Sequence, residues 1–543
     1  MGFQTGMMMD APLTITAILR RAAQFFPEKE IVSRLNDGSI HRYTYADLYR
    51  RVIRLMHVLR NLGVKPGDRV ATFAWNSYRH LELYFAVPCL GAILHTVNIR
   101  LFPEQLTYIF NHAEDRLIFA DKSLAGLLTP LQSELKTVEG YVLMDDRGEA
   151  PAALPGPAWD YEELLASASD VEAFPCLDEN MAASICYTSG TTGEPKGVLY
   201  THRSLYLHTM ACCMGDTMDI REREIVLPVV PMFHANAWGM PYACAMAGAT
   251  QVLPGSHLFG KPLAELIERE RVTIAAGVPT VWNLLYQYLQ QHPHDLSRLK
   301  VILSGGSAVP RVLFENYTRD YGITMIQAWG MTEMSPLGSL CRLKASMEDW
   351  PEEQQLAVRM KQGIPTVNVE VKLLGEQGEE LPWDGKQAGE LAVRGPWVAC
   401  AYYANADANA AFTQDGWFRT GDIATLDAHG YLEITDRKKD VIKSRGEWIS
   451  SVDMENAVMG HPAVLEAAVV GRLDDLRGEA PVVYIVLRHP DQPLPPQEVL
   501  DVLKARFARW QLPRQTDIHV VASLPKTGVG KVDKKAIRRN LTE

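Results

Sequence analysis

Short apolar runs alternate with helical stretches along the first part of the chain, and this alternation constrains the fold more than any other feature. Near the N-terminus, Leu48, Val52, Leu55, Leu59 and Leu62 recur at helical spacing, Gly63 can cap the helix, and DRVATFAW follows as a strand. Further runs that end in Gly, Pro or Ser are RLIFAD, GYVLMD, ASICYTSG, EIVLPVV, VTIAAGVP and KVILSGGS, with helices such as AELIERE between them. This pattern predicts an α/β fold with a mostly parallel sheet, whose binding sites lie at the carboxyl ends of strands.

The pattern changes after Val367. VEVKLLG, GELAVRG and IATLDAHGYLEITD alternate around Gly-containing turns and predict a small β-rich subdomain at about 367–436. VDMENAVMG, APVVYIVLR, PPQEVLDVLKARFA and DIHVVASL then predict a compact α+β unit. The charged run DRKKD between them is either a solvated turn or an interdomain hinge. We therefore predict an N-terminal domain over 1–436 and a C-terminal domain over 437–543.

Composition and charge exclude several classes of protein. The 543 residues are 47% apolar and 22% charged, which is typical of folded globular chains. The 54 Lys and Arg against 65 Asp and Glu give a formal net charge of −11, which argues against nucleic acid as the main partner. Any phosphate that this chain binds therefore needs a local site.

Cysteine usage and the N-terminal sequence indicate a cytoplasmic protein. None of the eight cysteines forms a CxxC pair, which favours free thiols in a reducing cytosol and no structural metal. MGFQTGMMMD carries no export signal or lipid-anchor pattern. The uncharged stretch 225–260 is broken by Pro228, Pro231, Pro241, Gly239 and Gly248, so we expect a buried pocket wall there and no transmembrane segment.

The loop YTSGTTGEPKG, at 187–197, predicts a phosphate-binding site. Glycines let backbone amides approach phosphate oxygens, hydroxyls donate to them, and a lysine supplies positive charge. A flexible Ser/Gly linker is the alternative, and the loop is not a Walker A loop because Pro195 stands where the second glycine belongs. The residues predicted to bind phosphate are Thr188, Ser189, Gly190, Thr191, Thr192, Gly193 and Lys196.

This loop resembles the signature of the AMP-forming acyl-CoA synthetase family, which includes luciferases and peptide-synthetase adenylation domains. Further motifs of that family follow in order as PMFHANAW, SGGSAVP, QAWGMTE, GWFRTGD, ITDRKKDVIKSRGEW and PKTGVGK. The resemblance covers nearly the whole chain. It implies a large N-terminal domain of stacked mixed sheets and helices with a small mobile C-terminal domain. The implied reaction joins a carboxylate to ATP as acyl-AMP, releases pyrophosphate, and then transfers the acyl group to a thiol.

The resemblance implies a nucleotide site built from three motifs. The motif QAWGMTE contributes Gln327, Ala328, Trp329, Gly330 and Thr332, with the aromatic ring on adenine and the threonine on the α-phosphate. Gly305, Gly306 and Ser307 leave room for the purine, while Asp422 holds the ribose with Arg437 as its basic companion. Glu333 and Thr188 are the implied Mg²⁺ ligands. The alternatives are a core tryptophan, a tight turn and solvated surface charges.

Trp329 departs from the family pattern, which usually has Tyr at this position. Tryptophan stacks at least as well on a purine but brings no hydroxyl. We therefore do not expect the hydrogen bond that a tyrosine hydroxyl would make at this position.

Two further residues are implied to act on the reacting groups. His234 in PMFHANAW can reach the carboxylate and the α-phosphate, although a lone histidine is more often a core residue. Lys531 in PKTGVGK resembles the adenylation lysine, whose ammonium stabilises charge that builds up during attack; an exposed terminal lysine is the alternative. The segment around His234 carries no aspartate for an amino group, so the acid is predicted to be apolar. Trp238, Met240 and Trp282 are candidate walls of the acyl pocket, or core residues.

The resemblance also implies a hinge and a coenzyme A channel. Lys439 is the implied hinge residue, and the loop KSRGEW then lines the pantetheine channel. Gly446 leaves a narrow path for the thiol. The other candidates for contact with coenzyme A are Lys443, Arg445, Glu447 and Trp448.

We therefore predict a cytoplasmic acyl-CoA ligase that uses ATP, coenzyme A and Mg²⁺ on a medium or long apolar carboxylic acid. PMFHANAW and QAWGMTEMSP are similar to bacterial medium-chain and methylthio-propionate ligases, so a short sulfur-containing acid is one alternative. The others are an acyl-AMP ligase that loads a carrier protein, a luciferase-like monooxygenase and a non-catalytic nucleotide-binding regulator. A homodimer is compatible with the sequence.

Overall fold

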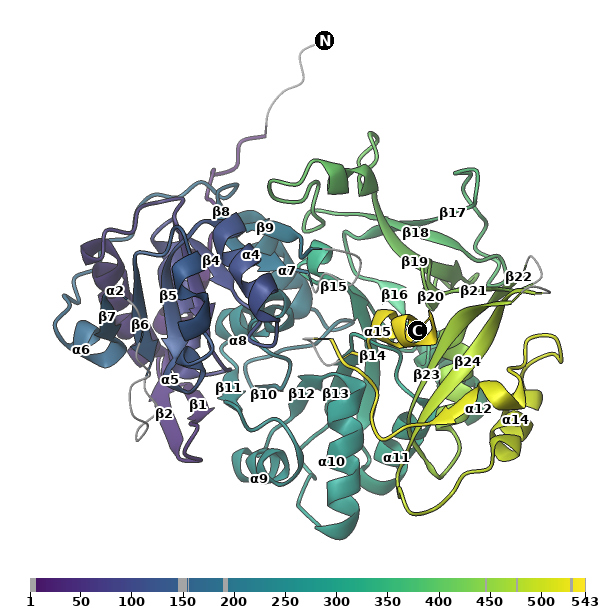
Figure 1. Ribbon diagram of the computed structural model, residues 1–543. Helices are drawn as coiled ribbons and strands as arrows, with labels where there is room; N and C mark the ends of the chain where they lie inside the picture. Colours follow the sequence, from purple (N-terminus) through teal and green to yellow (C-terminus); the bar gives the residue numbers. More distant parts are fainter. Residues whose placement is uncertain are drawn as a thin grey trace.

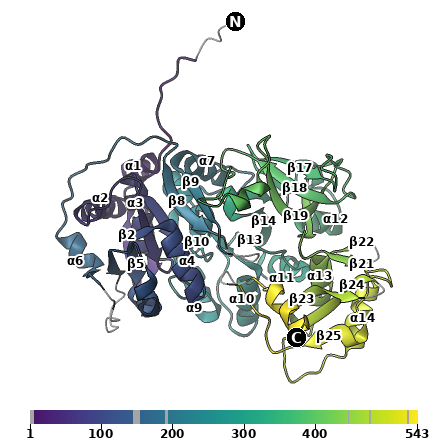
Figure 2. The same ribbon diagram turned by 45° about the horizontal axis from the view of Figure 1, so that its top comes forward.

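The computed structural model describes residues 6–144, 154, 156–188, 194–444, 447–474, 477–527 and 531–542. Two large sheets, a small antiparallel sheet and a C-terminal α+β unit follow one another (Figures 1 and 2). The predicted α/β fold with a β-rich part and a small C-terminal α+β part is confirmed. The domain boundaries at 436 and 437 stay predictions.

The first large sheet has nine strands in the order β16-β15-β14-β13-β12-β10-β11-β1-β2. From β14 to β1 all neighbours are parallel, and the three remaining pairs are antiparallel. Its strands are β1 Glu30–Arg34, β2 Ile40–Thr44, β10 Ile225–Pro228, β11 Thr250–Leu253, β12 Ile274–Gly277, β13 Val301–Gly305, β14 Thr324–Gly330, β15 Leu337–Leu340 and β16 Ile364–Pro365.

The second large sheet has seven strands in the order β7-β6-β5-β3-β4-β8-β9. All its pairs are parallel except β8 with β9. Its strands are β3 Arg69–Phe73, β4 Ile93–Thr96, β5 Asp115–Asp121, β6 Gly140–Met144, β7 Ala158–Asp160, β8 Ala182–Tyr187 and β9 Gly197–Thr201.

Helices fill the space between the two large sheets and cover their outer faces. α3 is buried along its whole length because it lies in the central layer. The helices of this layer are α1 Ile15–Phe25, α2 Tyr45–Asn61, α3 Tyr78–Cys89, α7 His202–Cys212 and α8 Met240–Ala247. The outer helices are α4 Pro103–Ala113 and α5 Lys122–Ala125 on the second sheet, and α9 Gly260–Glu270, α10 Pro279–Gln291 and α11 Arg311–Tyr321 on the first. Two shorter helices are α6 Tyr161–Ala166 and α12 Glu352–Arg359.

Alternating side chains explain this layering. In β10 and β12, Val226, Ile274 and Ala276 face the central layer, whereas Leu227 and Ala275 face the outer helices. Both faces of these strands are apolar, as expected for parallel strands that are buried on two sides.

The rest of the chain forms two smaller sheets. The four-stranded antiparallel sheet contains β17 Glu370–Leu374, β18 Gly389–Arg394, β19 Phe418–Leu426 and β20 Leu432–Arg437. The C-terminal sheet contains β21 Ile442–Ser444, β22 Glu447–Ile449, β23 Val464–Asp474, β24 Gly478–Leu487 and β25 Ile518–Val520. Its helices are α13 Ser451–Met459, α14 Pro496–Lys504 and α15 Lys534–Thr542.

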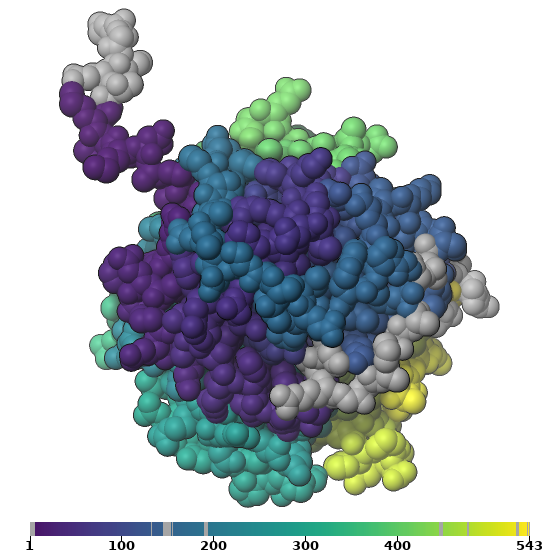
Figure 3. All heavy atoms as spheres, turned by 90° about the vertical axis from the view of Figure 1, so that its left-hand side faces the viewer, coloured from purple at the N-terminus to yellow at the C-terminus, as the bar shows by residue number. Residues whose placement is uncertain are grey.

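The described part of the N-terminal arm, from residue 6, extends away from the body (Figure 3). Among the described helices, none has the length and apolar character that a membrane span requires. All eight cysteines are free, and five of them are buried.

Candidate active site

The predicted nucleotide residues lie where parallel strands of the nine-stranded sheet end. Gly305 and Gly306 close β13, Trp329 and Gly330 close β14, and His234 follows β10. These strands run in the same direction with β12 between β10 and β13, so their carboxyl ends share one edge. This is the edge of an α/β sheet at which ligands bind.

Lys531 reaches this edge from the C-terminal unit. Gly306 has φ +85°, and a methyl group built on it would lie 3.4 Å from Cε and 3.9 Å from Nζ of Lys531. A larger residue at 306 would therefore be strained and would crowd the lysine. Burial and the positive charge of Arg437 lower the pKa of Lys531 to about 8, although Asp422 and Glu333 act in the opposite direction.

His234 lies in the same electrostatic environment. Burial and the charge of Lys531 lower the pKa of its imidazole to about 3. The ring is therefore neutral at physiological pH, and it can donate or accept a hydrogen bond without adding charge to the site.

Asp422 and Trp329 are buried and form a hydrogen-bonded group with the more exposed Arg437. Arg437 Nε lies 2.7 Å from Oδ1 of Asp422, and Nε1 of Trp329 donates to Oδ2 at 2.9 Å. The charge of Asp422 raises the pKa of Arg437. The indole N–H thus supplies a donor that orients the predicted ribose carboxylate, at the position where the family usually has a tyrosine hydroxyl.

The structure gives Glu333 and Thr332 tyrosine partners that the sequence did not reveal. Tyr402 Oη donates to Oε1 of Glu333 at 2.6 Å, and Tyr200 Oη donates to the carbonyl oxygen of Thr332 at 2.6 Å. Both predicted site residues are buried, with Glu333 only 6% exposed. The partners lie far away in the sequence, and a tyrosine in a loop or a strand carries no motif that could have identified them.

The two described ends of the predicted phosphate loop are tied together. The backbone N–H of Thr188 donates to the carbonyl of Lys196 at 2.9 Å, and the N–H of Lys196 donates back to Oγ1 of Thr188 at 3.1 Å. Lys196 Nζ lies 4.9 Å from the centre of the Tyr402 ring. The loop residues between these ends, 189–193, lie outside the described residues.

Gln327 and Ala328 support the glycine turn from β14. Gln327 Oε1 accepts the N–H of Val309 at 2.7 Å, and Ala328 pairs with Gly305 across the two strands. Gly330 permits close packing, since a methyl group there would meet the carbonyl of Pro336 at 1.9 Å. Ser307 follows this turn and is exposed.

A strained turn follows His234. Asn236, Ala237 and Trp238 have φ values of 53°, 49° and 57°, which is left-handed backbone that L-residues rarely adopt in succession. Asn236 is fully buried and lies 3.4 Å from the Ser184 hydroxyl. Such strain persists only where the surrounding packing fixes it, and it occurs preferentially at functional sites.

The three candidate acyl-pocket residues occupy different places. The strained turn directs the Trp238 ring to Gly305, where a methyl group would lie 3.4 Å from the tip of the indole. Met240 is fully buried at the start of α8. Trp282 packs in the core of α9, α10 and α11, with its N–H donating to the Gly277 carbonyl at 3.2 Å. The structure therefore brings Trp238 to the nucleotide edge, and the pocket roles of all three stay predictions.

The predicted hinge residue Lys439 follows Arg437 by two positions, and the predicted coenzyme A segment begins on β21. Lys439 is exposed, and partial burial with the charges of Arg437 and Arg538 lowers its pKa despite the opposing effect of Asp440. Lys443 is exposed on β21, and its backbone N–H donates to Glu479. Arg445 and Gly446 lie outside the described residues, and only the backbone of Glu447 and Trp448 is described, in β22.

Another residue that the sequence did not single out is Arg100, which follows β4. Its guanidinium lies 5.9 Å from the ring centre of Phe233, directly before His234. Loss of surrounding water lowers the pKa of this group. Among the described residues, no carboxylate pairs with it.

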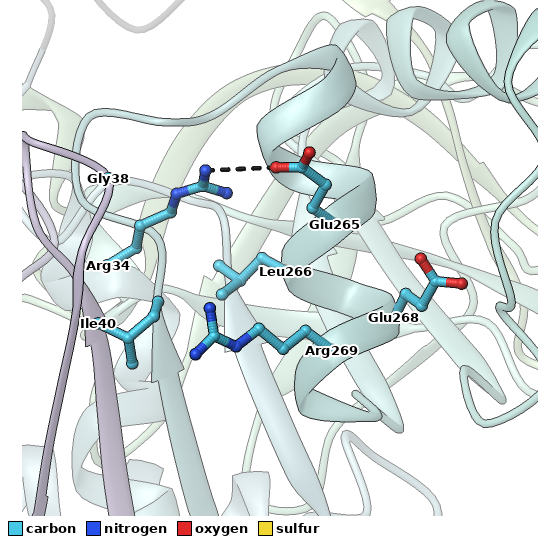
Figure 4. A pocket seen from close by; sticks show the side chains of 7 residues that line it. All are labelled: Arg34, Gly38, Ile40, Glu265, Leu266, Glu268 and Arg269. Atoms are coloured by element: carbon cyan, nitrogen blue, oxygen red, sulfur yellow. Dashed lines mark hydrogen bonds and ion pairs between the residues drawn. The ribbon is translucent and has the colours of Figure 1, made fainter.

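A groove of about 320 Å³ lies between the β1–β2 hairpin and α9 (Figure 4). Arg34 and Glu265 form an ion pair across it at 3.3 Å. None of the predicted site residues lines this groove, so we do not connect it with the site. In the described part of the chain, no group of three or more His, Cys, Asp or Glu side chains could hold a metal ion by itself.

Comparison with known proteins agrees with this geometry. Residues 19–403 match the model of the AMP-binding enzyme family, and residues 453–531 match that of the AMP-binding enzyme C-terminal domain. The chain is 47% identical over 533 residues to a long-chain-fatty-acid–CoA ligase of Thermus thermophilus, covering 98% of this chain and 96% of that protein. It is 43% identical to a 3-methylmercaptopropionyl-CoA ligase of Ruegeria lacuscaerulensis, covering 98% of each. A crystal structure of an anthranilate CoA ligase in complex with anthranoyl-AMP has a TM-score of 0.87 and 25% identity, covering 98% of each chain.

Proposed function

The chain belongs to the AMP-binding enzyme family, and from this membership we propose that it is an ATP-dependent, AMP-forming acyl-CoA ligase. It activates a carboxylic acid as acyl-AMP with release of pyrophosphate and then transfers the acyl group to coenzyme A. The observation that carries this proposal is the position of Lys531, whose ammonium lies against Gly306 at the edge that also holds His234 and Asp422.

In the proposed adenylation step, a carboxylate oxygen of the acid attacks the α-phosphorus of ATP and pyrophosphate leaves. Negative charge on the α-phosphate oxygens grows in the transition state, and the Lys531 ammonium and the Thr332 hydroxyl stabilise it. Neutral His234 orients the acid. Trp329 covers adenine, and Asp422 accepts the ribose hydroxyls while Arg437 and the Trp329 indole N–H hold its carboxylate.

We propose that Mg²⁺ binds with the nucleotide. Mg²⁺ usually takes one or two protein oxygens and completes its shell with phosphates and water, so a single buried carboxylate suffices. Glu333 fits, because Tyr402 occupies its Oε1 and leaves Oε2 for a cation; Thr188 supplies a second oxygen. The ion when bound neutralises charge on the phosphates.

The acid is proposed to be medium or long and apolar. The segment from His234 to Ala247 carries no charged side chain, and the Trp238 indole forms an apolar surface beside Gly305. The relative from Thermus thermophilus is named for long-chain fatty acids. A second candidate is a short sulfur-containing acid, favoured by the 43% identity to a 3-methylmercaptopropionyl-CoA ligase.

For the second step we propose that the C-terminal domain rotates about Lys439. Lys531 then leaves the site and the segment from Lys443 to Trp448 takes its place, which lets one domain serve two half-reactions. Arg100, unpaired among the described residues, offers positive charge for the phosphates of coenzyme A.

The experiment that tests this function is pyrophosphate release across unbranched acids from acetate to palmitate, together with methylthio-propionate and cinnamate. Each acid is assayed with ATP and Mg²⁺, with and without coenzyme A. We expect maximal release with a medium or long acid, strongly accelerated by coenzyme A. Pyrophosphate release at a rate that does not depend on coenzyme A would favour a carrier-protein acceptor. No pyrophosphate release with any acid would contradict the proposal.

We further propose a cytoplasmic location, which the eight free thiols support. A homodimer stays a prediction, which light scattering of the purified protein tests.

A further inference from the structure

The loop segment 399–403 lies between β18 and β19 of the four-stranded sheet. It contacts Glu333, the predicted metal ligand. The N–H of Ala399 donates to the backbone carbonyl of Glu333 at 2.8 Å, and Tyr402 Oη donates to Oε1 of the same residue. The N–H of Tyr403 donates to the carbonyl of Gly197 at 2.9 Å. One short segment therefore contacts Glu333 twice and also contacts the end of the phosphate loop.

Tyr402 is itself firmly held. Its side chain is 7% exposed, its backbone N–H donates to Oδ1 of Asn409 at 2.8 Å, and its ring packs on Phe412 at a centroid distance of 5.3 Å. A hydroxyl at a fixed position restricts the rotation of the carboxylate that accepts its hydrogen bond. Burial and the neighbouring negative charge of Glu333 raise the pKa of Tyr402, so it stays a donor at physiological pH.

The Tyr402 ring has a separate contact, with Lys196. The ammonium lies 4.9 Å from the ring centre, within the range of a cation–π interaction. The hydroxyl and the ring thus face two groups of opposite charge, Glu333 for the cation and Lys196 for the phosphates.

We propose that Tyr402 is a positioning residue that sets both groups for Mg·ATP: its hydroxyl turns Oε2 of Glu333 toward the cation, and its ring seats the Lys196 ammonium. This inference rests on the proposed function, because it assumes a Mg-nucleotide at this site. No reaction step passes through Tyr402 itself.

The two contacts can be separated by substitution. Tyr402→Phe keeps the ring and removes the hydroxyl, whereas Tyr402→Leu removes both. Tyr161→Phe is the matched control, since Tyr161 Oη in α6 donates to the buried Glu82 of α3 at the same 2.6 Å. Thermal unfolding of the three variants measures the loss of stability that each substitution causes.

The readout is the Kd of a non-cleavable α,β-methylene ATP analogue, measured by calorimetry with Mg²⁺ and with EDTA. In the wild type we expect Mg²⁺ to tighten binding. Loss of an outer partner of a metal ligand typically costs about 10–100-fold in metal affinity, so Tyr402→Phe loses about tenfold or more of this tightening. Its Kd in EDTA stays unchanged, while Tyr402→Leu also weakens binding in EDTA.

Three outcomes separate the claims. If Tyr402→Phe keeps the same Mg²⁺ tightening as Tyr161→Phe and the wild type, the role of the hydroxyl is wrong. If Tyr402→Leu binds the analogue in EDTA as tightly as Tyr402→Phe, the role of the ring is wrong. If the wild type itself binds no nucleotide, the proposed function fails, and this result is distinct from the other two.

Discussion

Two lysines of the C-terminal unit, Lys531 and Lys443, are in different environments. Lys531 lies against Gly306, and burial with the charge of Arg437 lowers its pKa to about 8. Lys443 is exposed on β21, which lies between the edge strand β22 and β24 in the C-terminal sheet (Figure 1). Lys531 therefore lies at the proposed adenylation site, whereas Lys443, which belongs to the proposed coenzyme A segment, is exposed to solvent; we infer that this arrangement serves adenylation.

A buried group at the predicted hinge holds this arrangement. Asp436 on β20 accepts the N–H and the hydroxyl of Ser451 at 2.7 and 2.6 Å. Lys534 Nζ donates to the same hydroxyl at 2.6 Å and lies 2.7 Å from Glu455. Asp436 precedes Lys439 and its partners follow it, so rotation about Lys439 would break these contacts. The parts of the chain before and after Lys439 are therefore coupled through this polar group. Substitution of Asp436 tests that coupling.

The largest effect is expected from Lys531→Ala. Removing one donor that stabilises transition-state charge typically costs about 10²–10³-fold, so acyl-AMP formation should fall by that factor. Transfer of the acyl group from synthetic acyl-AMP to coenzyme A should change by less than about threefold, because Lys531 has left the site. Single-turnover measurement of each half-reaction checks this. Equal losses in both would contradict the proposal that Lys531 leaves the site before acyl transfer.

The pH dependence gives the next largest effect. The functional form of Lys531 is the ammonium, and its pKa is lowered to about 8, so kcat/KM for adenylation should fall about tenfold per pH unit well above pH 8. The acyl-transfer step should lack this alkaline limb. In Lys531→Arg, whose guanidinium stays charged, the limb should disappear from whatever activity remains. If the alkaline limb persists in that variant, a group other than Lys531 causes it.

Asp436→Ala should weaken the contacts across the hinge. Hydrogen bonds to a charged group contribute about 1.5–3 kcal/mol, so adenylation should fall about tenfold while acyl transfer is kept. Asp440→Asn is the control, since its ion pair with Arg538 at 2.6 Å lies wholly after Lys439. The two half-reaction rates of both variants measure the effect, and identical behaviour of the two would exclude a role for Asp436 in the arrangement.

The smallest effect is expected from Lys443→Ala. An exposed cation contributes about 0–1 kcal/mol to an ionic contact, so KM for coenzyme A should rise up to about fivefold. The KM for ATP and pyrophosphate release without coenzyme A should not change. Steady-state kinetics with each substrate varied in turn will show this. A rise in the KM for ATP would contradict the proposal that Lys443 contacts only coenzyme A.

The sequence predicted the strand and helix pattern and the family, but only part of the site. Strand ends such as those of β12 and β13 follow from apolar runs that stop at glycine, and the motifs indicated Lys531 and His234. The hydrogen-bond partners of the neighbouring site residues Glu333 and Trp329 could not be predicted from the sequence. Tyr402 and Glu333 are 69 residues apart and Trp329 and Asp422 are 93 apart, and contacts of that kind depend on how separate sheets pack.

The sequence also did not predict the strained turn at Asn236 to Trp238. These residue types do not favour left-handed backbone in succession, so local propensity predicts a different conformation. Only tertiary packing, with Asn236 buried beside Ser184, accounts for it.

The most direct test of the whole account follows one turnover by mass spectrometry. Enzyme, ATP, Mg²⁺ and octanoate are mixed without coenzyme A, and coenzyme A is added afterwards. We predict that octanoyl-AMP accumulates to the enzyme concentration and converts to octanoyl-CoA after the addition. If another acid from the panel is preferred, it replaces octanoate. Absence of any acyl-AMP, or an acyl-AMP that coenzyme A leaves unchanged, would contradict the account.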